Sequence, residues 1–128
     1  MRGRSEKSIL NDTLLEVSAL PDSLFYRNNT GMAWQGKRGD YYVGEYIKVE
    51  RDMVVLHDAR PVHFGLVGSG DIMGAYANRP VAIETKTLTG RQEQQQRLFE
   101  VAWRKAGGIY ILSRSPEEAV PKLLLGYK

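Results

Sequence analysis

The sequence contains no cysteine and only two histidines, His57 and His63. The absence of cysteine excludes disulfide bonds and thiolate metal sites, and it is typical of proteins from a reducing compartment. The two histidines do not have the spacing of metal ligands, so we expect them at the surface or at the edge of the core.

Long apolar runs are absent as well. No stretch approaches the roughly 18 apolar residues that a membrane-spanning helix needs. The first residues, Met-Arg-Gly-Arg-Ser-Glu-Lys, are charged, and no apolar segment of a secretory signal follows them. We therefore expect a soluble intracellular protein with no membrane partner.

The chain also has no large excess of positive or negative charge. Its 18 Lys and Arg residues and 15 Asp and Glu residues give a net charge of only +3. This balance permits a nucleic-acid partner without requiring one, and binding would need a concentrated basic face. The chain has 128 residues, 42% of them hydrophobic, which is typical of a globular protein. We assign residues 1–128 to a single domain.

The hydrophobic patterning predicts a mixed sheet with helices packed against it, an α/β fold. Helices are expected at residues 5–20, 92–106 and 116–125, and strands at 24–27, 71–75, 81–87 and 109–112. The pair at 71–75 and 81–87 would be joined by a turn at 78–80. A glycine-rich turn at 67–70 suits a backbone that must approach another group closely.

The region between these elements predicts a β-hairpin. Residues 41–49 and 53–56 would form its strands around a turn at 50–52, and residues 61–66 another short strand. Several aromatic side chains occur in or near it: Trp34, Tyr41, Tyr42 and Tyr46. They could stack on unpaired bases, but such side chains more often bury an interface, which we favour.

Asp71, Glu84 and Lys86 form the most informative constellation. Glu84 and Lys86 are two residues apart in the apolar run 81–87, so in a strand they point to the same face. Burying both charged groups costs several kcal/mol unless they pair with each other or bind a metal ion. Buried charges are retained mainly where they have a functional role, and this pattern suggests a divalent-metal site that hydrolyses a phosphodiester.

Phosphodiester hydrolysis requires a hard cation with oxygen ligands, a water and nearby positive charge. Asp71, Glu84, the Thr85 backbone carbonyl and Glu6 of the first helix could supply the ligands, with Lys86 orienting the water. Two simpler explanations remain open. Glu84 and Lys86 could be a solvated pair on an edge strand with Asp71 in a turn, and Glu6 could be an exposed first-turn acid favoured by the helix dipole.

Four segments carry a resemblance: Gly-Ser-Gly-Asp-Ile-Met-Gly, Val-Ala-Ile-Glu-Thr-Lys-Thr, Gln-Glu-Gln-Gln-Gln-Arg-Leu-Phe and Ala-Gly-Gly-Ile-Tyr-Ile-Leu-Ser-Arg-Ser, all between Gly68 and Ser115. They resemble the virus-type replication-repair nuclease (VRR-NUC) domain of the PD-(D/E)XK superfamily, in its stand-alone phage and bacterial form. The resemblance implies a restriction-endonuclease-like mixed central sheet flanked by helices. The predicted hairpin would be an insertion, because residues 35–60 have no counterpart.

The resemblance also implies roles for individual residues. Asp71 and Glu84 become ligands of Mg²⁺ or Mn²⁺, Lys86 the catalytic lysine and Glu6 the acid of the first helix. A glutamine on the second helix joins the catalytic site; Gln96 fits best, while Gln92 and Gln95 stay open. The sequence departs from the family in having Gly70 where Pro or Ser usually precedes the Asp, a change that we expect to preserve activity.

These features predict a structure-selective, metal-dependent DNA endonuclease, most simply a Holliday junction resolvase in the cytoplasm of a bacterium or a phage-infected cell. One site per chain and two strands to cut imply a homodimer on a four-way junction. A nuclease for flaps, ends or foreign duplex is the alternative enzyme, and a non-catalytic DNA-binding subunit the alternative of another class. The candidate DNA-binding residues are Arg27, Asn28, Asn29, Arg91 and Arg97.

Overall fold

The computed structural model describes residues 3–39, 48 and 50–126. The chain divides into two compact units, one made of Met1–Thr30 with Gly65–Lys128 and the other of Gly31–Phe64. Each unit is described by itself.

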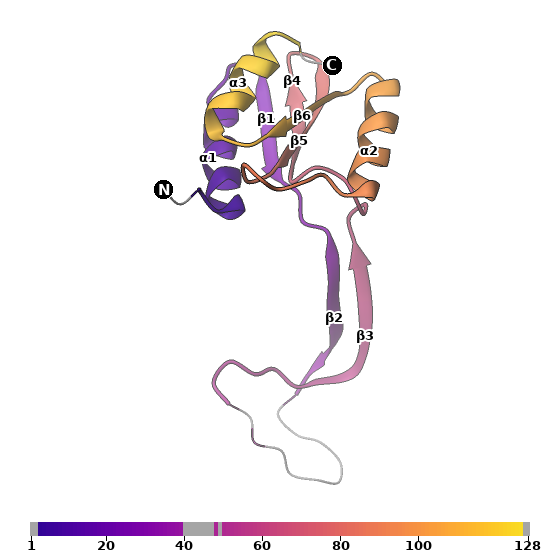
Figure 1. The fold of residues 1–128 in the computed structure, drawn as a ribbon. Helices are drawn as coiled ribbons and strands as arrows, with labels where there is room; N and C mark the ends of the chain where they lie inside the picture. The colour runs from indigo at the N-terminus through magenta and orange to yellow at the C-terminus, as the bar shows by residue number, and fades with distance from the viewer. Residues whose placement is uncertain (1–2, 40–47, 49, 127–128) are drawn as a thin grey trace. The chain divides into compact units, whose positions relative to one another are not determined.

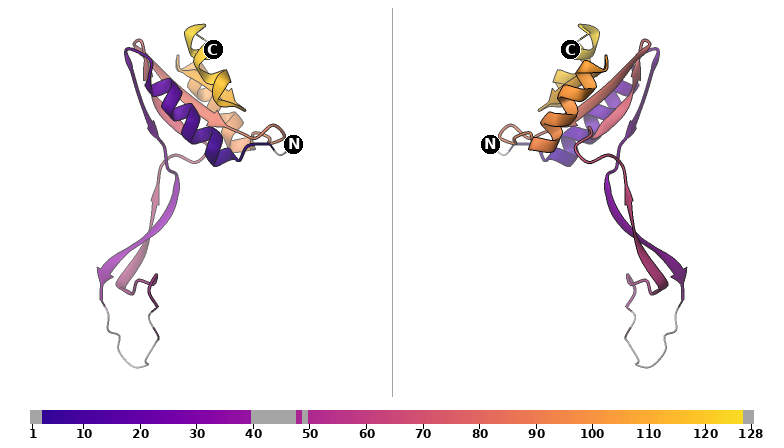
Figure 2. Two further views of the ribbon diagram at one scale, coloured as in Figure 1. Left: turned by 90° about the vertical axis from the view of Figure 1, so that its left-hand side faces the viewer. Right: turned by 90° about the vertical axis from the view of Figure 1, so that its right-hand side faces the viewer.

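The first unit has three helices and a four-stranded sheet (Figure 1). Its elements follow the chain in the order α1 (Glu6–Ser18), β1 (Ser23–Arg27), β4 (Ile72–Tyr76), β5 (Arg79–Thr85), α2 (Gln94–Lys105), β6 (Ile109–Ser113) and α3 (Pro116–Leu124). Helices α1 and α3 lie together on one face of the sheet and α2 lies on the other, as the two side views show (Figure 2). The predicted mixed α/β class is therefore confirmed.

The sheet has the strand order β1-β4-β5-β6. Strands β1 and β4 and strands β4 and β5 pair antiparallel, whereas β5 and β6 pair parallel, so the sheet is mixed. Strand β5 is internal, and its residues from Val81 to Thr85 are all buried. The core combines this strand with residues of α1, β1, β4, β6 and α3: Leu10, Val17, Phe25, Ile72, Val81, Ile83, Ile109, Ile111, Ala119 and Leu123.

The hairpin between β4 and β5 was predicted and is confirmed, although its turn is residues 77–78 and not the predicted 78–80. Tyr76 pairs with Arg79, which leaves Ala77 and Asn78 as a two-residue turn with φ angles of 47° and 69°. Two consecutive positive φ values are the signature of a type I′ turn, whose twist matches that of the strands it joins. This turn fixes the register that brings the end of β5 beside the start of β4.

The helix ends follow from local sequence. The Ser5 hydroxyl accepts a hydrogen bond of 3.1 Å from the Ser8 N–H and caps α1, as N-cap serines commonly do. Gly107 follows α2 at a φ of +99°, a conformation that favours glycine. Both boundaries were predicted to within two residues.

The second unit is an antiparallel two-stranded sheet of β2 (Gly31–Arg38) and β3 (Leu56–Phe64). The predicted strand at 53–56 is wrong, because β3 begins only at its last residue; β3 also takes in the first part of the predicted strand at 61–66. Nearly all of the predicted strand at 41–49, with its three tyrosines, lies outside the described residues. Strand β2 was not predicted, since all of its residues are exposed and it carries no burial pattern.

Among the residues that the structure describes, no helix is long and apolar enough to cross a membrane.

Candidate active site

The end of β5 and the residue directly after it place two charged side chains in the interior of the first unit. Glu84 is 1% exposed and Lys86, directly after the strand, is 7% exposed. The Lys86 Nζ lies 3.6 Å from Glu84 Oε1. A solvated pair on an edge strand is thereby excluded, because both side chains are buried and β5 is internal.

Asp71 lies at the start of β4, beside the end of β5. Its Oδ2 accepts two hydrogen bonds of 2.9 Å from Thr85, one from the backbone N–H and one from the side-chain hydroxyl. The antiparallel pairing of Ile72 with Ile83 makes this contact possible. Asp71 is therefore a fixed part of the site and more than a turn residue.

Gly70 precedes Asp71 in a very narrow space. A Cβ atom at this position would lie 2.9 Å from the carbonyl oxygen of Ile83 and 3.0 Å from its nitrogen. Real Cβ atoms almost never come so close to a backbone, so a side chain would push β4 away from β5. Glycine at this position is therefore required by the close packing of β4 against β5.

Asn28 holds the same turn from the other side. Its Nδ2 donates to Ser69 Oγ at 2.8 Å and to the Gly70 carbonyl at 2.9 Å. Its backbone N–H donates to the Asp71 carbonyl at 2.8 Å. The polar atoms of Asn28 thus fix the loop that presents Asp71, a role that the sequence did not indicate.

Glu6 in the first turn of α1 completes an acidic cluster. One carboxylate oxygen from each of Glu6, Asp71 and Glu84 can be chosen so that all three lie within 4.8 Å of one another. Ligand oxygens on opposite sides of a Mg²⁺ ion are about 4 Å apart. Small rotations of the three side chains would therefore bring their oxygens to the spacing that one cation requires. Glu84 Oε2 is buried without a hydrogen-bond partner among the described residues. Its lone pairs are therefore available to coordinate a cation.

The electrostatics of Glu84 reflect this crowding. Burial raises the pKa of its carboxyl from 4.5 to about 8; the Asp71 carboxylate adds to the rise, Lys86 opposes it, and Glu6 adds a smaller contribution. Burial and like charge both disfavour an ionised carboxyl. A divalent cation reverses that preference, because it stabilises the carboxylate directly. The donor set is therefore chemically suited to Mg²⁺ or Mn²⁺, both of which prefer oxygen ligands.

Two of the three open glutamines contact the buried network. Gln96 Nε2 donates to Glu84 Oε1 at 2.8 Å, and Gln96 Oε1 accepts from the Glu93 N–H at the start of α2. Gln92 Nε2 instead donates to Glu100 Oε1 at 3.0 Å and to the Tyr110 hydroxyl at 2.9 Å. Of these, Gln96 is the one in contact with a predicted metal ligand.

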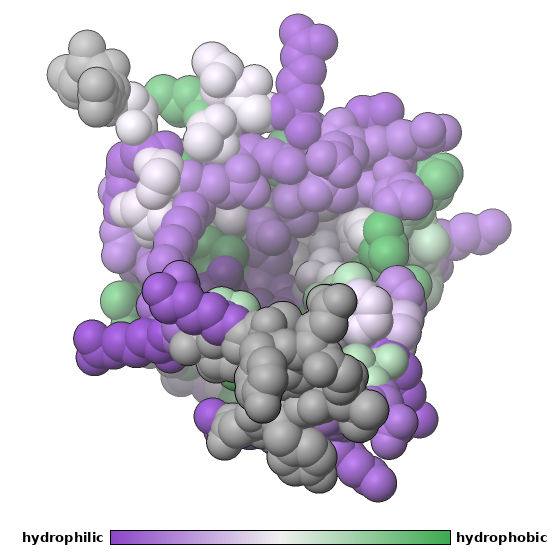
Figure 3. All heavy atoms as spheres, turned by 90° about the horizontal axis from the view of Figure 1, so that it is seen from below, coloured by the Kyte–Doolittle hydropathy of each residue, from purple (hydrophilic) through white to green (hydrophobic). Residues whose placement is uncertain are grey.

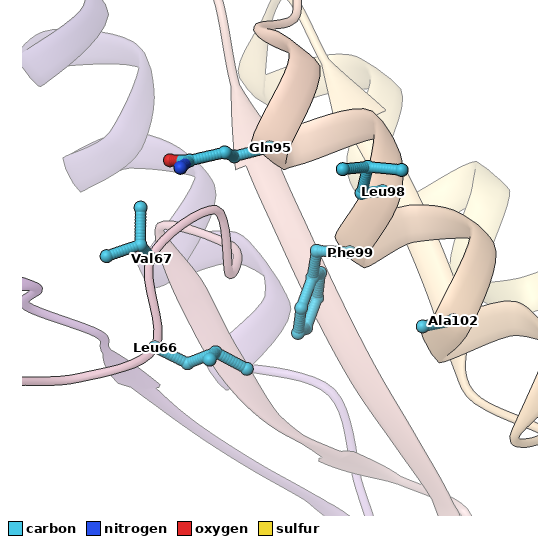
Figure 4. Close-up of a pocket in the computed structure, with 6 residues that line it drawn as sticks. All are labelled: Leu66, Val67, Gln95, Leu98, Phe99 and Ala102. Carbon is cyan, nitrogen blue, oxygen red and sulfur yellow. The ribbon is translucent and has the colours of Figure 1, made fainter.

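Gln95 lines a separate apolar groove of about 300 Å³ between α2 and the loop that contains Leu66 and Val67 (Figure 4). The close-up shows its side chain extending toward Val67. The groove is formed by the following residues: Leu66, Val67, Gln95, Leu98, Phe99 and Ala102. Because it contains no charged group, it is not the predicted metal site.

The remaining candidate DNA-binding residues lie at the surface. Arg27, Asn29, Arg91 and Arg97 are exposed, and Arg97 Nη1 donates to the Gln92 carbonyl at 2.6 Å. Hydrophilic residues, purple in Figure 3, make up most of the face drawn there outside the grey atoms. DNA contact by these side chains stays a prediction.

Arg114, which was not predicted as a site residue, supports the loop that follows Lys86. Its Nη1 donates to the carbonyls of Thr87 at 2.7 Å and Gly90 at 2.6 Å, while the Lys86 N–H donates to the Ser113 carbonyl at 3.0 Å. These bonds fix the loop that directly follows Lys86. No sequence signal could have identified them, because the partner atoms are backbone carbonyls.

Comparison with models of known protein families gives no match, and no curated protein matches the sequence. The resemblance to the VRR-NUC domain thus stays a prediction from the motifs.

Proposed function

We propose that this chain is a structure-selective, divalent-metal-dependent DNA endonuclease with a VRR-NUC domain of the PD-(D/E)XK type. The observation that carries the proposal is the buried Oε2 of Glu84, which has no hydrogen-bond partner among the described residues. Glu84 also belongs to an acidic cluster with Glu6 and Asp71. A folded protein keeps such an acid in its interior when a ligand compensates the cost. The buried lysine beside the cluster adds the positive charge that phosphodiester cleavage needs.

In the proposed mechanism, Mg²⁺ or Mn²⁺ would be held by Glu6, Asp71, Glu84 and the Thr85 carbonyl. When bound, the ion would supply a Lewis acid for the phosphoryl group and would favour deprotonation of a water. The ammonium of Lys86 orients the attacking water and offsets negative charge that develops on the phosphate. Gln96 holds Glu84 Oε1 by its hydrogen bond, so that the carboxylate keeps one orientation throughout.

The substrate in this proposal is branched DNA, most simply a four-way junction. A junction presents two strands for cutting, whereas one chain carries one cluster, so paired incision implies a homodimer. Contacts to phosphates do not distinguish one base sequence from another, so selectivity would come from the shape of the junction.

The proposal is tested by cleavage of a labelled four-way junction with and without Mg²⁺, beside flap, splayed and linear substrates. Asp71→Asn and Glu84→Gln should lower cleavage about 100-fold or more, because each removes a charged ligand of the ion. Both variants should still bind the junction. Exposed Lys105→Gln is the matched control for Lys86→Gln, and only Lys86→Gln should lose activity.

Full cleavage by Asp71→Asn would refute the assignment of the site. Preference for flaps or ends over junctions would favour the alternative nuclease. Absence of cation-dependent hydrolysis on every substrate, with binding retained, would support a non-catalytic DNA-binding subunit. A measurement of mass in solution, with and without junction, tests the homodimer.

A further inference from the structure

The four-stranded sheet of the first unit ends in two outer strands, β1 and β6. The outer strand β6 has its backbone carbonyls occupied by cationic side chains. Arg104 Nη2 donates to the Tyr110 carbonyl at 3.1 Å, and Lys122 Nζ donates to the Leu112 carbonyl at 3.1 Å. Charged side chains along an edge strand are a common means of preventing another strand from pairing with it. The β6 edge is therefore closed to further strands.

Strand β1, at the opposite end of the sheet, is not protected in this way. Its residues Ser-Leu-Phe-Tyr-Arg include no proline and no lysine, and its register with β4 contains no bulge. No strand pairs with its outer edge in the part of the chain that the structure describes. The side chains of Leu24 and Tyr26 are 73% and 55% exposed. An apolar edge strand of this kind is suited to pairing with a further strand.

The backbone groups that β1 offers to such a strand follow from its pairing with β4. The Asn28 N–H donates to the Asp71 carbonyl, and the Ala77 N–H donates to the Asp22 carbonyl. In both bonds the residue on the β1 side is even-numbered, and residues of an antiparallel strand alternate between facing the partner and facing away from it. The N–H and C=O groups of the odd-numbered residues of β1 therefore point outward: Ser23, Phe25 and Arg27.

A second copy of β1 fits this edge in an antiparallel register about a two-fold axis at Phe25. Phe25 would exchange two backbone hydrogen bonds with Phe25 of the second copy, and Ser23 would pair with Arg27, so every outward group of the strand finds a partner. Leu24 would lie directly opposite Tyr26 of the second copy, at a Cα separation of about 4.5 Å. Such aliphatic–aromatic pairs stabilise sheets. The one charged residue, Arg27, would face a serine and no like charge.

We propose that two copies of this chain pair through their β1 strands and form one continuous sheet. A strand of an unrelated protein could also add to an open edge, but an isologous contact requires that one short sequence complement itself. The sequence of β1 meets this requirement, because rotation about Phe25 places Leu24 against Tyr26 and leaves no like charges opposed. The inference rests on the proposed function only for the need of two sites on one junction. The strand pairing itself requires none of the clustered carboxylates.

Cysteine cross-linking tests the register, because the chain contains no cysteine of its own. Leu24→Cys and Tyr26→Cys are prepared as separate full-length variants and oxidised mildly, each alone and in an equimolar mixture. Directly opposed residues about 4.5 Å apart suit a disulfide. The mixture should therefore give several-fold more cross-linked dimer than either variant alone. A mixture of Leu15→Cys and Leu125→Cys, at exposed positions on other elements, is the control and should give none.

The mass in solution tests the contribution of the same two side chains to association. The double variant Leu24→Glu/Tyr26→Glu would oppose carboxylates across the pairing, and like charges in this position repel. The dissociation constant of the dimer should rise about tenfold or more. Urea unfolding checks that the double variant is folded. Leu15→Glu, at an exposed position of α1, is the control and should keep the dissociation constant within about twofold of the parent.

A parent protein that stays monomeric with and without junction DNA would overturn the proposal. Equal cross-linking of the mixture and of the separate cysteine variants would do the same, as would an unchanged dissociation constant in the folded double variant. A dimer that cross-links as expected but never cleaves branched DNA would refute the nuclease and support the strand pairing. Cleavage of both junction strands by a monomer would refute the strand pairing and leave the nuclease intact.

Discussion

Gln96 on α2 and Glu84 on β5 are joined by a hydrogen bond of 2.8 Å from the amide Nε2 to the carboxyl Oε1. The same amide closes the capping box of α2, because its Oε1 accepts from the Glu93 N–H at 2.8 Å. Both ends of the Gln96 side chain are therefore fixed. The start of α2 thereby holds one oxygen of Glu84, while the other oxygen, Oε2, is buried without a hydrogen-bond partner among the described residues.

Gln96→Ala is expected to lower the single-turnover cleavage rate about 10- to 100-fold, since loss of a group that orients a metal ligand typically has this effect. A Mg²⁺ titration of the rate should also show weaker apparent metal binding. Gln95→Ala is the matched control on the same helix turn, because Gln95 faces the apolar groove and not Glu84. An equal loss in Gln95→Ala would show that the effect comes from the helix and not from the contact.

Much of the first unit could be predicted because its elements have one-sided or continuous apolar patterns. Strand β5 is internal and buried from Val81 onward, so it appears in the sequence as an apolar run interrupted only by the residues of the site. The proximity of Asp71 followed from the expected hairpin, since an antiparallel partner returns the chain to the same place. Glu6 of the first helix was proposed as a further ligand, and the structure brings this exposed acid to the same cluster.

The remaining features could not be predicted from these patterns. Strand β2 is exposed along its whole length, so hydrophobic periodicity has no burial to reflect. The choice among three neighbouring glutamines depends on the rotation and position of α2, which the local sequence does not determine. Asn28 was interpreted as a possible DNA contact, but its amide is used by the turn before Asp71, a contact between distant segments.

Asn28→Ala is expected to reduce cleavage about tenfold or more while changing affinity for the junction less than about twofold. The substitution removes two hydrogen bonds that hold the turn at Ser69 and Gly70, and small displacements of a reacting group have large effects on rate. The measurements are the single-turnover rate and the binding constant in EDTA. Asn29→Ala, at the exposed neighbouring position, should leave the rate unchanged. If Asn28→Ala lost affinity for the junction by the same factor as it lost rate, the result would support a role of Asn28 in DNA binding.

Gly70→Ala should destabilise the protein by about 1–3 kcal/mol, the usual cost of overpacking a tight interior. The added Cβ would meet the Ile83 backbone at 2.9–3.2 Å, and Asp71 would move with β4. Urea unfolding measures the stability, and cleavage by the folded variant measures the displacement of Asp71. Gly3→Ala is the control, because an added Cβ there meets nothing within 4 Å. Unchanged stability and rate in Gly70→Ala would mean that β4 and β5 separate without cost.

The buried acid should make the stability of the metal-free protein fall as the pH rises from about 4.5 to about 8. Between these values folded Glu84 keeps its proton, because its pKa is raised to about 8, whereas the unfolded chain has already released it. The folded state then binds more protons than the unfolded state, so the free energy of unfolding decreases with increasing pH. The contribution is present in full below the unfolded pKa and is lost above the folded one, with a total of a few kcal/mol.

The measurement is urea unfolding in EDTA across this pH range for the parent and for Glu84→Gln, which cannot titrate. The difference between the two profiles isolates Glu84 from the other titrating groups. The free energy of unfolding of the parent should fall relative to that of Glu84→Gln as the pH rises toward 8. Mg²⁺ at pH 8 should restore stability to the parent by binding only the folded carboxylate cluster, and it should have little effect on Glu84→Gln. Parallel pH profiles for the two proteins would show that Glu84 is ionised in the folded state without a cation, and the unpaired Oε2 would then need another explanation.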